Sequence, residues 1–175
     1  MKSKPCIDSL TVKTSYVLPP DTNGYGTLFG GKLMAYIDDV AAIAAARHAR
    51  STVVTASTDS VDFLNPVKEG DSICVEAFVT WTHHTSMEIF VKAVTENLTT
   101  GKRMVCATAF LTFVALDNDG RPTPVPPVYP ESAQEKELND LASARADHRN
   151  ERRKQSKKMA ETFGTDFPWN RLKSK

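Results

Sequence analysis

The residues of this chain whose types and spacing could do chemistry are concentrated between Asp21 and Asp39, in the stretch DTNGYGTLFGGKLMAYIDD. Four of its nineteen residues are glycine, and it also holds one asparagine and two adjacent carboxylates. A plain helix start needs only one capping residue. This surplus of flexible and polar residues ahead of an apolar helix therefore indicates a site where backbone and side-chain groups converge on a ligand.

Gly30 and Gly31 could supply backbone hydrogen-bond donors. A helix that begins at this pair would point unpaired N–H groups outward with no side chain in the way, and such donors can polarise a carbonyl group. A glycine pair can also do no more than form a tight turn. The amide of Asn23 could hold a carbonyl oxygen or orient a water molecule, although an Asn-Gly pair is also common in plain turns.

Asp38 and Asp39 are the candidates for a base or a nucleophile. Successive helical residues are about 100° apart, so with the apolar face centred on Ile37, Asp38 falls at the edge of that face and Asp39 nearly opposite. We therefore expect Asp38 to be partly buried and within reach of a substrate, and Asp39 to be a solvated surface charge. General base and nucleophile remain equally open for Asp38, because both roles need an ionised carboxylate near a carbonyl.

Hydrophobic periodicity indicates the elements that would position these residues. Apolar residues alternate from Leu10 to Leu18, as in a strand, and from about Gly31 they recur every three or four positions, as in a helix that continues to about Arg50. The second half of this helix is mostly alanine, which lets another element approach it closely. The pattern predicts four further strands, over residues 53–63, 72–81, 86–94 and 103–116. Short turns would join them into an antiparallel meander.

The last of these strands is apolar in both alternating sets of residues, which is typical of a strand covered on both faces. We therefore expect it to be central in the sheet and the folded core to end near Leu116. Five prolines follow between Pro122 and Pro130, and they cannot continue a regular element. The chain is thus expected to form one domain over residues 1–130 and a charged helical tail over residues 131–175.

Composition excludes several classes of protein. The chain has 175 residues, a net charge of +1 and 41% hydrophobic residues, which suits a globular core but gives no electrostatic footprint of a nucleic-acid-binding protein. No run has the character of a signal peptide or a membrane span. Three widely spaced cysteines predict a reduced, cytoplasmic protein in which the thiols are structural. His83 and His84 lack neighbours at ligand spacing, so no metal site is predicted.

The stretch DTNGYGTLFGGKLMAYIDDVA resembles the signature of the acyl-CoA hydrolases, a thioesterase group with the hotdog fold. VVTASTDSVDFLNPVKEGD and ATAFLTFVALDNDGRPTPVP resemble later strands and the exit segment of that group, so the resemblance covers about residues 8–130. It implies an α+β hotdog fold, with an antiparallel five-stranded sheet wrapped around a long central helix. It also implies hydrolysis of an acyl-CoA to CoA and a free acid, with no cofactor beyond the coenzyme A of the substrate.

The resemblance further assigns roles to particular residues. The asparagine and the acidic residue of the family motif fall on Asn23 and Asp38, and Gly30 and Gly31 would polarise the thioester carbonyl. The resemblance also implies a homodimer joined sheet edge to sheet edge, assembled further into a trimer of dimers. Asn23 of one subunit would then face Asp38 of its neighbour.

Two other functions remain open for the same fold. A non-catalytic acyl-CoA-binding sensor would use the same cleft without hydrolysis. A hotdog dehydratase would need a catalytic histidine near the helix, and His48 is too far along it.

Coenzyme A carries a pyrophosphate and a 3′-phosphate, so a chain of net charge +1 must gather positive charge locally to bind it. The run from Arg149 to Lys158 holds six basic residues and one acidic residue. Arg149, Arg152 and Arg153 would share one helical face, and arginine suits phosphate oxygens. We expect these arginines and Lys32 to bind the CoA phosphates, and a solvated tail is the alternative.

Overall fold

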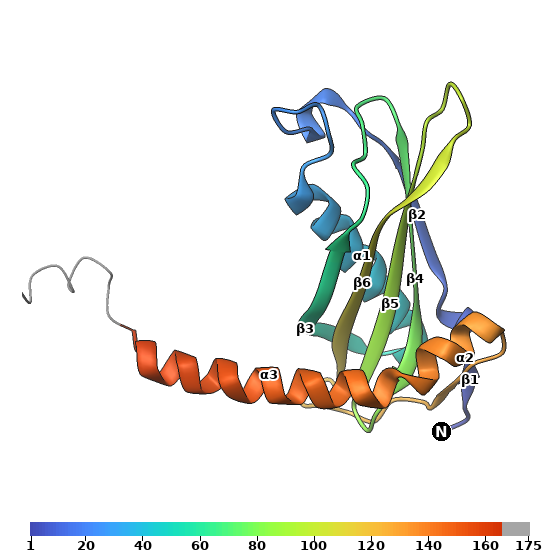
Figure 1. Ribbon diagram of the computed structural model, residues 1–175. Coiled ribbons are helices and arrows are strands. Elements are labelled where there is room, and N and C mark those ends of the chain that lie inside the picture. Colours follow the sequence, from blue (N-terminus) through green and yellow to red (C-terminus); the bar gives the residue numbers. More distant parts are fainter. Residues whose placement is uncertain (166–175) are drawn as a thin grey trace, which may run out of the picture. The chain divides into compact units, whose positions relative to one another are not determined.

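The computed structural model describes residues 1–165, so the last ten residues of the predicted tail lie outside the described part. The chain divides into two compact units, of which the first comprises residues 1–140. In this unit the long helix α1 (Gly30–Ala49) packs against one face of a five-stranded antiparallel sheet, as the hotdog fold requires (Figure 1). The strands are β2 (Thr11–Tyr16), β3 (Thr52–Phe63), β4 (Ser72–Thr82), β5 (Ser86–Glu96) and β6 (Arg103–Leu116).

The order of strands in the sheet is β2-β4-β5-β6-β3. Consecutive hairpins join β4, β5 and β6, but β3 pairs with β6, with Thr52 opposite Leu116. The predicted four-strand meander is therefore wrong for β3, because periodicity identifies a strand but not its partner. Strand β6 was expected to be central. It is an interior strand that lies between β5 and β3, and β5 occupies the centre of the sheet.

The edge strand β3 is irregular. Its pairing with β6 shifts register between Thr55 and Ser57 and again between Thr58 and Ser60, which leaves Ala56 and Asp59 as bulged residues. A bulge bends a strand and increases its twist. The other edge of the sheet is β2, whose six residues pair with β4 in regular register.

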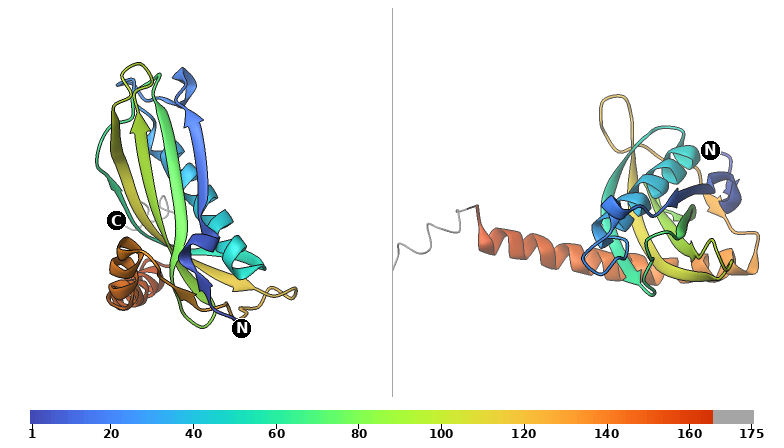
Figure 2. Two further views of the ribbon diagram at one scale, coloured as in Figure 1. Left: turned by 90° about the vertical axis from the view of Figure 1, so that its right-hand side faces the viewer. Right: turned by 90° about the horizontal axis from the view of Figure 1, so that it is seen from above.

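Alanine allows α1 to lie close to the sheet, as predicted. Ala41, Ala44 and Ala45 are fully buried, and the helix contacts all five strands of the sheet. Figure 2 shows the helix running along one face of the strands. The helix ends where Arg50 adopts a left-handed conformation with φ of 56° and donates its N–H to the carbonyl of Ala46 at 2.8 Å.

The segment after β6 stays on the core. Val125 is buried, and β7 (Val128–Tyr129) pairs in parallel with β1 (Lys4–Pro5). In the helix α2 (Ala133–Asp140), Asn139 donates a hydrogen bond of 2.7 Å from Nδ2 to the carbonyl of Thr80. The first unit therefore extends ten residues beyond the boundary expected at residue 130.

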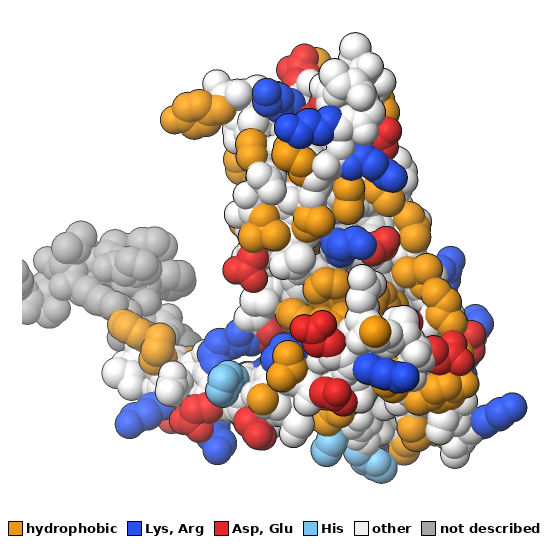
Figure 3. Space-filling view, turned by 45° about the vertical axis from the view of Figure 1, so that its right-hand side comes forward, with side chains coloured by type: hydrophobic (Ala, Val, Ile, Leu, Met, Phe, Trp, Pro, Cys, Tyr) orange, Lys and Arg blue, Asp and Glu red, His pale blue; other side chains and the backbone are white. Residues whose placement is uncertain are grey.

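The described part of the second unit is built on one helix, α3 (Ala142–Phe163), which carries the basic run of the tail. Within residues 1–165, no helix is both long and apolar enough to cross a membrane. On the face displayed in Figure 3, acidic and basic side chains are interspersed with hydrophobic ones rather than gathered by sign.

Candidate active site

The loop ahead of α1 is fixed by backbone hydrogen bonds. The N–H of Leu28 donates to the carbonyl of Val67, and the N–H of Phe29 donates to the carbonyl of Asp21, each at 2.8 Å. The next segment turns directly into the helix, where the N–H groups of Lys32 and Leu33 both donate to the carbonyl of Phe29, at 2.9 and 3.1 Å. The loop therefore sets both the position and the direction of the helix N-terminus.

The two N–H groups at this terminus that remain unpaired belong to Gly30 and Gly31. Neither donates a hydrogen bond to any residue of the part of the chain that the structure describes. Unpaired donors at a helix start carry a partial positive charge and attract an oxygen that bears negative charge. The glycine pair thus leaves two backbone donors unpaired at the start of the helix, and their action on a carbonyl group stays a prediction.

Two aromatic rings flank the glycine pair. A Cβ atom at Gly30 would lie 3.6 Å from Cζ of Phe63, and one at Gly31 would lie 2.9 Å from Cε1 of Phe29. The second distance is too short for a real contact, so any side chain at position 31 would displace the ring of Phe29. Phe29 is itself 58% exposed and its ring can turn away, so this contact alone does not account for glycine at position 31.

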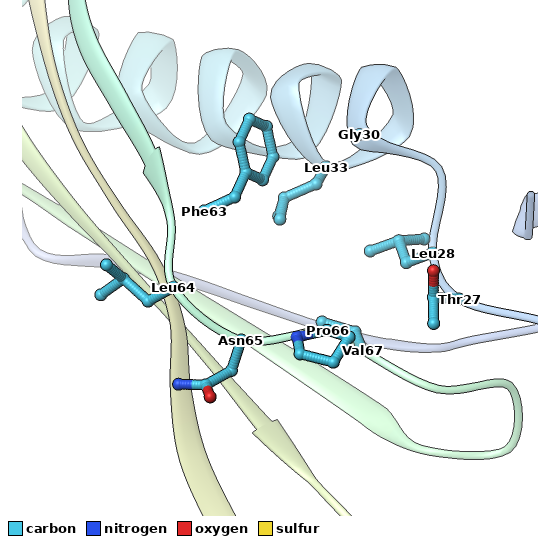
Figure 4. A pocket seen from close by; sticks show the side chains of 9 residues that line it. All are labelled: Thr27, Leu28, Gly30, Leu33, Phe63, Leu64, Asn65, Pro66 and Val67. Carbon is cyan, nitrogen blue, oxygen red and sulfur yellow. The ribbon is translucent and has the colours of Figure 1, made fainter. Parts of the chain in front are cut away.

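A pocket of about 190 Å³ opens beside Gly30, between the start of α1 and the segment that follows β3 (Figure 4). The side chains of Leu28, Leu33 and Phe63 point toward it, whereas those of Leu64 and Asn65 point away. Its complete lining consists of Thr27, Leu28, Gly30, Leu33, Phe63, Leu64, Asn65, Pro66 and Val67.

Asn23 lies in the loop near this pocket. Its Oδ1 accepts hydrogen bonds from the N–H of Tyr25 at 2.9 Å, and from the N–H and the Oγ1 of Thr27 at 3.3 and 3.1 Å. The amide oxygen is therefore committed to the turn. The Nδ2 group donates to no residue within 1–165. The side chain of Asn23 can therefore still donate a hydrogen bond to a ligand.

The two aspartates face opposite edges of the sheet. Oδ1 of Asp38 accepts a hydrogen bond of 3.0 Å from Oγ1 of Thr55 on β3, whereas Asp39 forms an ion pair of 3.0 Å with Lys13 on β2. Both carboxylates are exposed in the single chain, so the expectation that Asp38 is partly buried is wrong there. The sheet covers one face of α1 only, and a position at the edge of the apolar face remains open to solvent.

One chain does not bring all of these groups to one point. Gly31 and Asp38 are seven residues apart on α1, so they lie on nearly the same side of the helix but about 11 Å apart along its axis. The carboxylate of Asp38 therefore cannot reach a carbonyl that is held by the glycine N–H groups of its own chain.

The residues expected to bind phosphate are positioned less specifically. Nζ of Lys32 lies 3.1 Å from Oδ1 of Asp21, and this hydrogen bond raises the pKa of the lysine. On α3, Arg149 and Arg152 already have interaction partners within the described chain. Arg153 lines a shallow hollow of about 340 Å³ with Asn150, Lys154 and Lys157. Arg149 is buried, so the exposed cations of α3 in this stretch include Arg152, Arg153, Lys154 and Lys157.

Other candidate groups are structural. His48 is fully buried at the far end of α1, about 27 Å from Gly30 along the axis, and its Nε2 lies 2.8 Å from the carbonyl oxygen of Pro126. Burial raises the pKa of the thiols of Cys6 and Cys106 to about 12 and about 11, so neither is a ready nucleophile. Among the described residues, no cluster of His, Cys, Asp and Glu could hold a metal ion.

Thr55 is a site residue that the sequence did not reveal. A threonine in a predicted strand is ordinary, because β-branched residues favour strands. Its contact with Asp38 arises because β3 lies at the sheet edge beside α1, and this placement depends on the crossover that periodicity could not predict. An acidic residue on the helix with a hydroxyl on the following strand is the pattern that could have pointed to it.

The comparisons with known proteins agree with this architecture. A model of the thioesterase superfamily matches residues 25–102. The chain is 56% identical over 164 residues to an uncharacterized acyl-CoA thioester hydrolase of Bacillus subtilis, and the match covers 94% of this chain and 95% of that protein. The chain therefore belongs to the thioesterase superfamily, and within it to the acyl-CoA hydrolases that the glycine loop resembles.

Solved structures give the same result. A hexameric acyl-CoA thioesterase superposes with a TM-score of 0.85 at 50% identity, over 87% of this chain and 97% of its own. The acyl-CoA hydrolase of Staphylococcus aureus, solved in complex with butyryl coenzyme A and coenzyme A, superposes with a TM-score of 0.89 at 45% identity, over 93% and 99%.

Alanine variants of the Staphylococcus aureus enzyme have been solved at one asparagine, one aspartate and one threonine. In that enzyme the aspartate follows the asparagine by 15 positions, and the threonine follows the aspartate by 17. Asn23, Asp38 and Thr55 have the same two spacings in this chain.

Proposed function

We propose that this protein hydrolyses acyl-CoA thioesters to coenzyme A and a free carboxylic acid. The observation that carries the proposal is the pair of unpaired N–H groups at Gly30 and Gly31 beside an apolar pocket. As water attacks a thioester, negative charge develops on the carbonyl oxygen. Donors fixed in advance at the position of that oxygen stabilise the charge without having to reorganise.

Asp38 provides the carboxylate. As a general base it takes a proton from water while the water oxygen bonds to the acyl carbon, and the proton then passes to the departing CoA sulfur as the C–S bond breaks. As a nucleophile it bonds to the acyl carbon itself, releases CoA and forms an anhydride that water hydrolyses. In both routes Thr55 holds Oδ1 of Asp38, and Oδ2 is left for the reacting group.

The catalytic groups come from two subunits in this proposal. The axial separation of about 11 Å between Gly31 and Asp38 prevents them from acting on one carbonyl within a chain. A second copy, related by a two-fold axis and joined along the β3 edge, would set its helix antiparallel to the first. Each Asp38 would then face the Gly30, Gly31 and Asn23 of its neighbour, whose Nδ2 is the remaining donor.

We further propose a trimer of such dimers. The related acyl-CoA thioesterase that is described as hexameric supports this assembly. Strands β2 and β3 are the two edges of the sheet in a single chain. The unpaired backbone groups of an edge strand can join a sheet of another subunit edge to edge.

The phosphates of coenzyme A would be bound by basic side chains, namely those of α3 and Lys32. Arg152 and Arg153 are exposed on α3, together with Lys154 and Lys157, whereas the buried Arg149 would have to become accessible to bind phosphate. To bind phosphate, Lys32 would have to exchange its ion pair with Asp21 for one with the ligand. The three free cysteines fit a reducing compartment, and we propose a cytoplasmic location.

A thiol-release assay with a panel of acyl-CoA substrates tests the proposed function. Steady release of CoA from at least one substrate is expected. The alternative is a non-catalytic acyl-CoA sensor, which would bind an acyl-CoA tightly in a titration and release no thiol. A hydratase assay with an enoyl-CoA separates the dehydratase alternative, which the burial of His48 at the far end of α1 disfavours.

A further inference from the structure

We propose that the pocket beside Gly30 holds the acyl chain of the substrate, and that the ring of Phe63 determines how long a chain it accepts. This inference rests on the proposed thioesterase function and names the substrate class of that site. It starts from the fact that one residue, Gly30, belongs both to the lining of the pocket and to the pair of unpaired N–H donors.

The pocket suits an apolar guest. Leu28, Leu33 and Val67 are buried and form its base, and the side chains of Leu28, Leu33 and Phe63 point toward it (Figure 4). The polar side chains of the lining are already paired, since Oγ1 of Thr27 donates to Asn23 and Nδ2 of Asn65 donates to the carbonyl of Val105 at 2.8 Å. A hydrocarbon chain could fill this space without leaving those polar groups unpaired.

The position of the pocket links it to the reacting bond. A thioester carbonyl that accepts a hydrogen bond from the N–H of Gly30 has its acyl carbon within one bond of the accepting oxygen. The carbonyl carbon then lies close to the opening of the pocket that Gly30 lines. In this proposal the acyl chain enters the pocket, and the CoA sulfur, bonded to the same carbonyl carbon, lies on the solvent side.

The volume of the pocket indicates short chains. A space of about 190 Å³ holds roughly six groups of the size of a water molecule or a methylene, at about 30 Å³ each. A chain of four to six carbons would fill this space, whereas a decanoyl chain would extend past the open side of the pocket, so we expect the shorter chains to be preferred. The CoA thioesters that this site would hydrolyse are those of short-chain carboxylic acids.

Phe63 is the wall that can set this limit. Leu28, Leu33 and Val67 belong to the packed core and cannot move without opening a cavity. Phe63 is 55% exposed, ends the edge strand β3 and places its ring against Gly30, 3.6 Å from a Cβ built there. Removing this ring would extend the pocket outward along the helix. A larger ring at this position would shorten the pocket.

The test compares wild type with Phe63→Ala and Phe63→Trp on acyl-CoA substrates of two to twelve carbons. In an apolar pocket each methylene that is excluded or admitted changes kcat/KM by about tenfold or more. We expect wild type to prefer four to six carbons. Phe63→Ala should gain at least tenfold on decanoyl-CoA relative to butanoyl-CoA, and Phe63→Trp should lose at least tenfold on hexanoyl-CoA relative to acetyl-CoA.

A matched control is Leu98→Ala in the turn between β5 and β6. Leu98 is 54% exposed, close to the value for Phe63, but it lies outside the pocket, so its substitution should leave the chain-length profile unchanged. Thermal melting confirms that each variant is folded. If Phe63→Ala does not fold, Phe63→Leu is used, with a smaller shift in the same direction.

Binding of alkyl-CoA thioethers, which cannot be hydrolysed, is measured in parallel by titration calorimetry. If wild type releases no thiol but the thioether profile shifts in Phe63→Ala, the proposed hydrolysis is wrong and the pocket assignment stands. If wild type and Phe63→Ala have the same profile in both assays, the chain lies elsewhere and the inference is overturned.

Discussion

Oγ1 of Thr55 donates a hydrogen bond of 3.0 Å to Oδ1 of Asp38, and this contact joins the edge strand of the sheet to the exposed side of the central helix. It distinguishes the environment of Asp38 from that of Asp39, because Asp39 is paired with Lys13 on β2, at the opposite edge of the sheet. The two adjacent aspartates thus have different environments although both are exposed. Thr55 fixes the direction in which the carboxylate of Asp38 points.

Asp38→Asn should fold normally and lose turnover by about a hundredfold or more, because an amide can act neither as a base nor as a nucleophile. Asp39→Asn is the matched control, adjacent on the same helix, and should keep most of the activity. Thiol release from butanoyl-CoA measures both variants, with thermal melting to confirm their folding. Equal activity of wild type and Asp38→Asn would rule out the proposed role.

Thr55→Val should lower kcat by about tenfold and leave KM nearly unchanged, because a hydrogen bond to a charged group that orients the carboxylate is lost. Thr55→Ser keeps the hydroxyl and should recover most of the rate. Thr58→Val, an exposed threonine of the same strand, serves as the control for a β-branched substitution. A Thr55→Ser variant as slow as Thr55→Val would show that the methyl group, and not the hydrogen bond, matters.

Mixing two inactive proteins tests the shared site. Asn23→Ala and Asp38→Asn subunits, exchanged into verified heterodimers, should regain part of the wild-type activity, since one of the two sites then has an intact asparagine and an intact aspartate. Mass spectrometry verifies the heterodimers and thiol release measures recovery. Absence of recovery in heterodimers would contradict the assignment of Asn23 and Asp38 to different subunits.

The sequence predicted the elements of the fold closely and their pairing less well. The helix predicted from about Gly31 begins at Gly30 in the structure, and the predicted strands match the observed ones within a few residues, because periodicity reports which side of an element is buried. Neither the place of β3 beside β6 nor the contact of Thr55 with Asp38 could be predicted, since both depend on contacts between distant parts of the chain. The predicted burial of Asp38 was wrong for the single chain, because helical angles alone do not say how far a sheet extends around a helix.

Truncation after Ala144 tests the basic surface of α3. We expect the shortened protein to have a raised KM for acyl-CoA and a weaker dependence of KM on salt, because charges that bind phosphate have been removed. Turnover on a truncated thioester without the nucleotide should change little. If the truncated and full-length proteins treat both substrates alike, the tail has no part in CoA binding and is a solvated segment.

His48 should make the protein less stable in mild acid. Burial lowers its pKa below the ordinary value of 6.5, and nearby Lys4 acts in the same direction, while the hydrogen bond to the carbonyl of Pro126 and nearby Asp8 oppose the shift. Well above pH 6.5 the histidine is neutral in both the folded and the unfolded state and has no effect on stability. Below that value the unfolded chain binds the proton more readily, so the free energy of unfolding falls by up to about 1.4 kcal/mol per pH unit.

Urea unfolding at pH 7, 6 and 5 measures this effect. His48→Gln should flatten the pH dependence relative to wild type, even if the lost packing lowers stability at every pH. His84→Gln, at an exposed position, is the control and should leave the slope unchanged. An unchanged slope in His48→Gln would assign the acid sensitivity to other groups.

The long-range pairing of β3 with β6 has a consequence for the chain before it is fully folded. Thr52 pairs with Leu116, 64 positions away, whereas β4, β5 and β6 pair across short turns. Local pairs form readily, so β3 is exposed as a strand rich in β-branched residues until β6 is available. An unpaired strand of this kind is a template for aggregation. Once β3 has paired with β6, the bulges at Ala56 and Asp59 bend its free edge, so that a foreign strand in regular register matches it over short stretches only, whereas β3 of a second copy carries the same two bulges.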